Sequence, residues 1–158
     1  MTRVPYSRTL APAQREALAG WLRLVADTLW LRDWTIIVDD EAPDEPWANV
    51  RPTESYGDAL IKIDASLLNE TQLTIERVLV HELLHLHHGD LLLALRDATA
   101  SADGAIQAMA EATVRRYVER MVDNLAKVIV ASVPLPPLDD ILAAAPTHDV
   151  VARPVVGT

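Results

Sequence analysis

Cysteine is absent from the 158-residue chain, which excludes disulfide bonds and thiolate metal ligands. Any zinc ion would have to be bound by histidine, carboxylate or water. Basic residues are also scarce. The chain has 14 Lys and Arg and 23 Asp and Glu, which gives a net charge of −9. They are scattered along the chain, which argues against a nucleic-acid-binding surface. We interpret the acidity as a source of solubility.

Long apolar runs are missing too. Charged residues interrupt every stretch that approaches the roughly 20 apolar residues of a membrane span. No apolar segment of a secretion signal follows residues 1–8. We therefore expect a cytoplasmic protein without a membrane partner. Half of the residues are apolar, which predicts one globular domain with a substantial core.

The order of predicted elements indicates an α+β fold. A helix over residues 12–31 is expected to begin with Pro12 in its first turn, and a long helix is expected over 105–131. The first has apolar residues at helical spacing: Leu18, Trp21, Leu22, Val25 and Leu29. Short runs rich in β-branched or alternating apolar residues predict three strands, at 34–38, 47–51 and 59–64.

The remaining segments read as connections. Residues 39–46 contain two prolines and five acids, which is typical of a solvated loop, and they lack the ligand spacing of a calcium-binding loop. Residues 98–104 are small and polar and predict a connector. We place the domain at residues 1–132, followed by a proline-containing tail at 133–158. The tail could be a docked arm or flexible, and the sequence does not decide between them.

The most informative stretch is His-Glu-Leu-Leu-His at residues 81–85. It lies in an apolar segment expected to be a helix from 70 to 88, with Asn69 as N-cap and Gly89 as the residue that ends it. Residues four apart lie on one face of a helix, so His81 and His85 would direct two imidazoles at one point. Glu82 would reach a water molecule bound there. This spacing predicts two zinc ligands and a general base.

A catalytic zinc ion needs a third protein ligand. The candidates are His88, Asp90, Asp97, Glu111 and Glu119. We favour Glu111, because it lies at the edge of the apolar stripe of the second long helix, where a buried carboxylate needs a partner. Glu119 lies among charged residues on the expected solvent face. His88 shares the ligand face of its helix one turn later, which suits a residue on the substrate side or in solvent.

With these motifs the chain resembles the zincin-like metallopeptidases over residues 12–130. It is most similar to the small gluzincin-like type found in bacteriophages and bacteria, and Spartan-like proteases have comparable minimal cores. The metzincin class does not fit, because His88 and Leu91 stand where its glycine and third histidine belong. The resemblance implies an N-terminal helix, a small three-stranded sheet, a metal-binding helix and a long C-terminal helix.

The same resemblance implies a function. His81, His85 and Glu111 correspond to the Zn²⁺ ligands and Glu82 to the general base of a zinc peptidase. Strand 59–64 would line the cleft and pair with a protein or peptide substrate. The oxyanion donor could be His88, Tyr56 or Tyr117, although each is more often a structural residue. The alternative is a non-catalytic interaction or structural protein that retains the fold and a metal site. The oligomeric state is left open.

Overall fold

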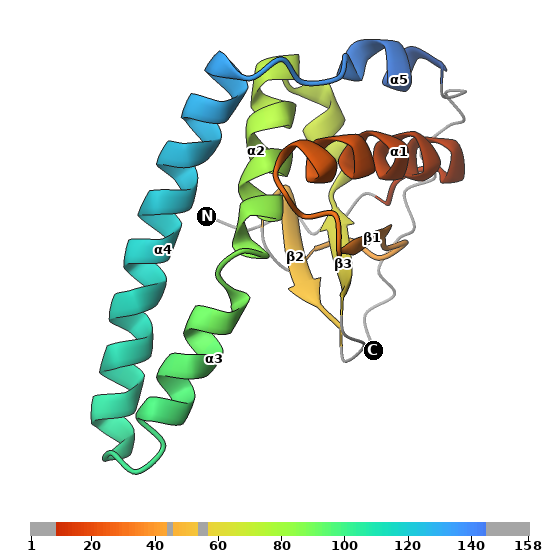
Figure 1. Cartoon of the computed structure of the whole chain (residues 1–158). Coiled ribbons are helices and arrows are strands. Elements are labelled where there is room, and N and C mark those ends of the chain that lie inside the picture. The colour runs from red at the N-terminus through yellow and green to blue at the C-terminus, as the bar shows by residue number, and fades with distance from the viewer. Residues whose placement is uncertain (1–8, 44–45, 54–56, 145–158) are drawn as a thin grey trace, which may run out of the picture.

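The computed structural model describes residues 9–43, 46–53 and 57–144 (Figure 1). The fold is α+β, with a three-stranded mixed sheet and a predominance of helix. In chain order its elements are α1 (Pro12–Thr28), β1 (Thr35–Val38), β2 (Ala48–Pro52), β3 (Asp58–Ile63), the 3-10 helix η1 (Ala65–Asn69), α2 (Gln72–His85), α3 (Gly89–Ala98), α4 (Gly104–Ser132) and α5 (Leu138–Ala144). This confirms the predicted class and its three strands.

Helix α1 ends three residues before the predicted position. Trp30 has a left-handed backbone with φ of 61°, in the place after the helix where glycine is usual. The Leu31 N–H donates to the Ala26 carbonyl at 2.9 Å, and the Trp30 N–H donates to the Asp27 carbonyl at 3.4 Å. These two bonds satisfy the last carbonyls of the helix and turn the chain towards β1.

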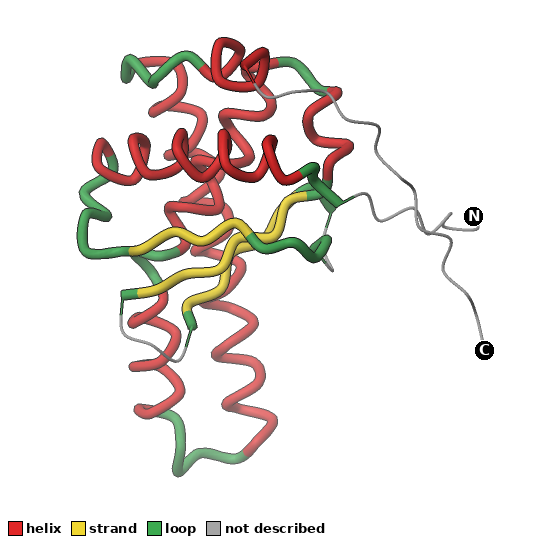
Figure 2. The backbone as a smooth tube through the Cα atoms, turned by 90° about the vertical axis from the view of Figure 1, so that its right-hand side faces the viewer, coloured by secondary structure: helices red, strands yellow, loops and turns green. Residues whose placement is uncertain are grey.

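The sheet has the order β1-β3-β2, with β3 parallel to β1 and antiparallel to β2. Ala59, Ile61 and Ile63 of β3 are buried and alternate with half-buried residues, so one face of the sheet meets the core. Helices α1 and α2 pack against this sheet (Figure 2). The predicted substrate-binding strand 59–64 is therefore the middle strand, with both edges already paired. That prediction is wrong, and β2 is the edge strand next to α2.

Helix α2 is shorter than predicted at both ends. Thr71 rather than Asn69 is its N-cap, and the Thr71 side chain accepts a hydrogen bond from the Thr74 N–H at 3.3 Å. The helix ends at His85, and Gly89 begins α3 instead of ending α2. Helix α3 was not predicted, whereas α4 extends one residue beyond each end of the predicted 105–131.

The segment after α4 is docked as far as it is described. Leu138 of α5 is fully buried, and the Trp21 indole N–H donates to the Pro136 carbonyl at 2.8 Å. The predicted tail at 133–158 is therefore docked at Pro136 and Leu138, and its residues 145–158 lie outside the described part. None of the helices in the described ranges combines the length and apolarity of a membrane span.

Candidate metal centre

The two histidines of α2 converge on one point, as their four-residue spacing predicts. Their Nε2 atoms are 3.1 Å apart, and the side chains of His81 and His85 are 22% and 23% exposed. The turn that carries them is held by Leu79, Val80 and Leu83, which are fully buried in the core. The helix therefore fixes the positions of both imidazoles while leaving them accessible from one side.

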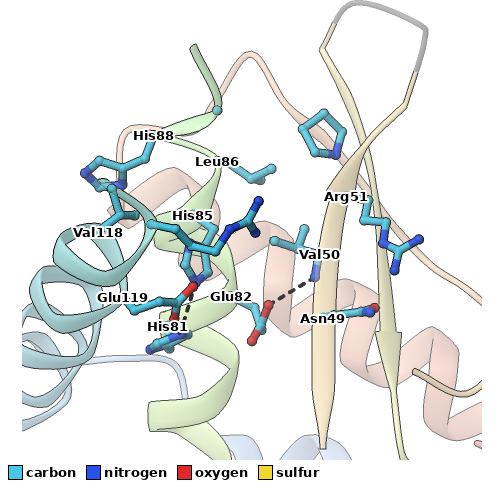
Figure 3. A pocket seen from close by; sticks show the side chains of 13 residues that line it. Asn49, Val50, Arg51, His81, Glu82, His85, Leu86, His88, Val118 and Glu119 are labelled. Atoms are coloured by element: carbon cyan, nitrogen blue, oxygen red, sulfur yellow. Dashed lines mark hydrogen bonds and ion pairs between the residues drawn. The ribbon is translucent and has the colours of Figure 1, made fainter. Parts of the chain in front are cut away.

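Glu119 of α4 lies across from this pair. One of its carboxylate oxygens is 3.4 Å from His81 Nε2, and the other is 3.5 Å from His85 Nε2. Figure 3 shows the carboxylate directed at both rings. In the described part of the chain, these three residues are the group whose histidine and carboxylate atoms lie close enough together to bind one metal ion.

The separations fit a tetrahedral zinc site. Zinc binds imidazole nitrogen and carboxylate oxygen at 2.0–2.2 Å, so neighbouring ligand atoms in a tetrahedron are about 3.3 Å apart. The three measured separations, 3.1, 3.4 and 3.5 Å, are all close to that value. Two imidazoles and one carboxylate are also a known catalytic ligand set that leaves the fourth position for water.

The electrostatics favour a metal-binding state of His85. Burial lowers the pKa of His85, and the nearby charges of His81, His88 and Arg115 lower it further, while Glu119 opposes the shift. A lowered pKa keeps the imidazole neutral near pH 7. The neutral ring has the free lone pair that a metal requires.

Glu82 is held beside the site by the edge strand. The Val50 N–H donates to Glu82 Oε2 at 3.0 Å (Figure 3). The backbone N–H of Val50 points away from β3. Trp47 and Thr53, at odd positions, form backbone hydrogen bonds with the chain at either end of β3, so the N–H groups at the even positions of β2 point outwards. The outward N–H of β2 is thus occupied by the carboxylate that the sequence predicts as general base.

These groups surround one cavity of about 330 Å³ between α2, α4 and β2. It is lined by His81, His85, Glu82 and Glu119, together with strand residues 49–52, His88 and Arg115. The Nδ1 of His88 donates a hydrogen bond to the Leu84 carbonyl at 3.0 Å, and His88 is not part of the metal-binding group. The cavity therefore brings a possible base and three possible ligands to the same space.

The structure does not bring Glu111, the third ligand that the sequence favours, to the two histidines. Its carboxylate lies 3.5 Å from the Arg96 Nε, and Glu119 takes the place expected of it. Helix α2 has 14 residues and is about 21 Å long, so it covers only part of the 29-residue α4. Glu119 directly follows the buried Val118 and lies where the two helices meet.

The sequence predicts three possible oxyanion donors. Tyr117 is exposed on the outer side of α4 and does not line the cavity. Tyr56 lies outside the described residues. His88 is one of the residues that line the cavity.

Compared with known proteins, the chain matched no family model, no curated protein and no solved structure.

Proposed function

We propose that the protein is a zinc-dependent peptidase whose metal ligands are His81, His85 and Glu119. The observation that carries the proposal is the common cavity, which Glu82 also lines and in which the possible ligand atoms of these three residues lie within 4.8 Å of one another. The residues support a zincin-like arrangement, with a histidine pair and adjacent glutamate on one helix and a glutamate on a later helix. The substrate class is a protein or peptide.

When bound, zinc would polarise the scissile carbonyl and lower the pKa of a water molecule towards neutrality. The chain itself supplies the proton transfer. Glu82 accepts the proton from the attacking water and later gives it to the leaving amine. The Val50 N–H holds the Glu82 carboxylate through Oε2 and so limits its rotation. A fixed base needs no reorientation before proton transfer, which lowers the barrier.

Strand β2 is the edge at which an extended peptide would add. Its outward donors are few, because the Val50 N–H is bonded to Glu82, the Ala48 N–H to the Pro46 carbonyl, and Pro52 has no N–H. The edge therefore offers chiefly carbonyl acceptors. Substrate binding would rely on N–H groups of the substrate, so a proline at the position facing the Val50 carbonyl should block cleavage.

Glu82→Gln tests the proposed base. The variant should keep one zinc per chain and lose peptide cleavage by about 10²–10⁴-fold, because the amide cannot accept the proton. Zinc is measured by mass spectrometry of the metal, and cleavage by product analysis of a proteome-derived peptide library. Glu76→Gln on the same helix is the matched control and should retain activity. Zinc-loaded wild-type protein that cleaves nothing would contradict the proposal and favour the non-catalytic alternative.

Val50→Pro tests whether the strand positions that base. Proline is tolerated at an outward N–H of an edge strand, and Pro52 already occupies a position of the same orientation. Loss of a hydrogen bond to a charged group costs about 1.5–3 kcal/mol, so kcat should fall roughly ten- to a hundredfold with KM and zinc content unchanged. Val50→Ala retains the N–H and should behave as wild type. Equal kcat values for the two variants would show that the bond has no role.

A further inference from the structure

Arg115 of α4 lines the cavity of the metal centre without a partner of opposite charge. It is exposed, and within the described part of the chain it forms no hydrogen bond or ion pair. Arg51 also lines this cavity, but Figure 3 shows its side chain on the far side of β2 from the two histidines. Arg115 is therefore the cation of the cavity wall that is available to a ligand.

The position of Arg115 in α4 brings its charge near the metal-binding group. Glu119 follows four residues later, so the two residues lie on one face of the helix, about 6 Å apart along its axis. Burial is the main cause of the lowered pKa of His85, and the positive charge of Arg115 is one of those that lower it further. An offset of about 6 Å corresponds to roughly two residues of an extended peptide. The guanidinium is therefore placed to meet a group on a substrate close to the metal centre.

The two carboxylates that line the cavity have other partners. Glu119 lies opposite the histidine pair, and Glu82 accepts a hydrogen bond from the Val50 N–H. Two arginines and two glutamates line the cavity and their charges cancel, so a bound Zn²⁺ would leave it with a net charge of +2 when the histidines are neutral. The whole chain carries −9. The zinc-loaded cavity therefore has the opposite sign of charge from the protein as a whole.

We propose that Arg115 binds a carboxylate of the substrate peptide within about two residues of the metal centre. The carboxylate is that of an Asp or Glu side chain or of the C-terminal end of the peptide. This inference rests on the proposed peptidase function and names its substrate class. The planar guanidinium forms two parallel hydrogen bonds with the two oxygens of a carboxylate, whereas an amide side chain offers only one acceptor oxygen. Arg115 is thus a specificity-determining residue that discriminates acidic peptides from their neutral analogues.

The net charge of the protein favours the opposite choice of substrate. A charge of −9 attracts basic peptides at long range. Salt screens exposed charges that are further apart than about 8 Å at physiological ionic strength, whereas Arg115 would contact its ligand directly. The contact therefore predicts a preference for acidic peptides that persists in salt, and the overall charge predicts a preference for basic peptides that salt weakens.

Selection of peptides by the zinc-loaded Glu82→Gln protein tests the proposal without requiring cleavage. Random octapeptides are passed over the immobilised full-length protein at about 0.15 M salt, and the bound fraction is sequenced by mass spectrometry. Asp and Glu should be enriched at least about fivefold over Asn and Gln. A second pool with amidated C-terminal ends distinguishes the two sources. Enrichment in both pools assigns the carboxylate to a side chain, and binding confined to the pool with free ends assigns it to the C-terminus.

Arg115→Gln, added to the same protein, should abolish the preference for a carboxylate and leave the zinc content unchanged. Arg116→Gln is the matched control, because it removes the same charge from the neighbouring exposed position, which does not line the cavity. Arg115→Lys keeps the charge and should keep part of the preference. A preference that survives Arg115→Gln, that is lost equally in Arg116→Gln, or that is absent or directed at basic peptides in the parent protein would overturn the proposal.

Cleavage of the same pools by the wild-type protein separates this proposal from the proposed function. Cleavage with no preference for a carboxylate would leave the peptidase standing and remove the role of Arg115. Acidic peptides that bind through Arg115 but are never cut would support the carboxylate-binding role and contradict the peptidase.

Discussion

The two halves of α4 differ in what they touch. Residues 118–132 contain all the buried side chains of the helix, Val118, Val122 and Ala126, and pack against α2. Residues 104–117 contain no buried side chain and lie beside α3, which has none among its described side chains either. Figure 1 shows the α3 end of this pair extending away from the sheet. One continuous helix therefore belongs to the domain core in one half and to the surface in the other.

This difference in packing determines which partners two glutamates of α4 meet. Glu119, in the packed half, is held opposite the histidines of α2, whereas Glu111, in the surface half, meets Arg96 of α3. An exposed ion pair of this kind contributes about 0–1 kcal/mol to stability. The neighbouring helix, rather than the position of a carboxylate within its own helix, determines whether it can take part in a metal site.

The largest effect on stability is expected in the packed half. Leu79 of α2 is fully buried among the residues that hold the histidine turn. Leu79→Ala removes its contacts and leaves a cavity, so the free energy of unfolding should fall by about 2–5 kcal/mol. Urea denaturation followed by circular dichroism measures it. A loss below about 1 kcal/mol would mean that α2 is not packed in the core as described.

The same substitution in the surface half should have the smallest effect. Leu93 of α3 is 57% exposed, so Leu93→Ala should change the free energy of unfolding by less than about 0.5 kcal/mol. The same urea titration applies, and the two variants differ only in the helix that carries the leucine. Equal losses for Leu79→Ala and Leu93→Ala would remove the distinction between the two halves.

Much of the fold follows from local pattern. The three strands and the long helices stand within a few residues of their predicted places, because alternation and helical spacing record which side is buried. Helix α3 escaped prediction because Gly89 was interpreted as an end, whereas it begins a new helix after a short turn. The strand order could not be read from the sequence, since pairing of β3 with both β1 and β2 is a tertiary choice.

The candidate site likewise has a part that local sequence predicts and a part that depends on tertiary contacts. His81 and His85 could be brought together from sequence alone, because their relation is fixed within one helix. Glu119 could not be selected, because its role depends on where α2 lies along α4. One signal was present: Glu119 directly follows Val118 and precedes Val122 by three residues, so it borders the face that is buried. The bond from Val50 to Glu82 joins a strand to a helix and had no local signal.

Zinc affinity of two matched variants tests the central claim most directly. Competition with a fluorescent chelator gives the dissociation constant of the wild type, of Glu119→Ala and of Glu111→Ala. We predict that Glu119→Ala weakens zinc binding at least about tenfold, because it removes one of three ligands, and that Glu111→Ala binds as the wild type does. Zinc binding that is lost in Glu111→Ala and kept in Glu119→Ala, or no zinc binding by the wild type, would contradict the assignment.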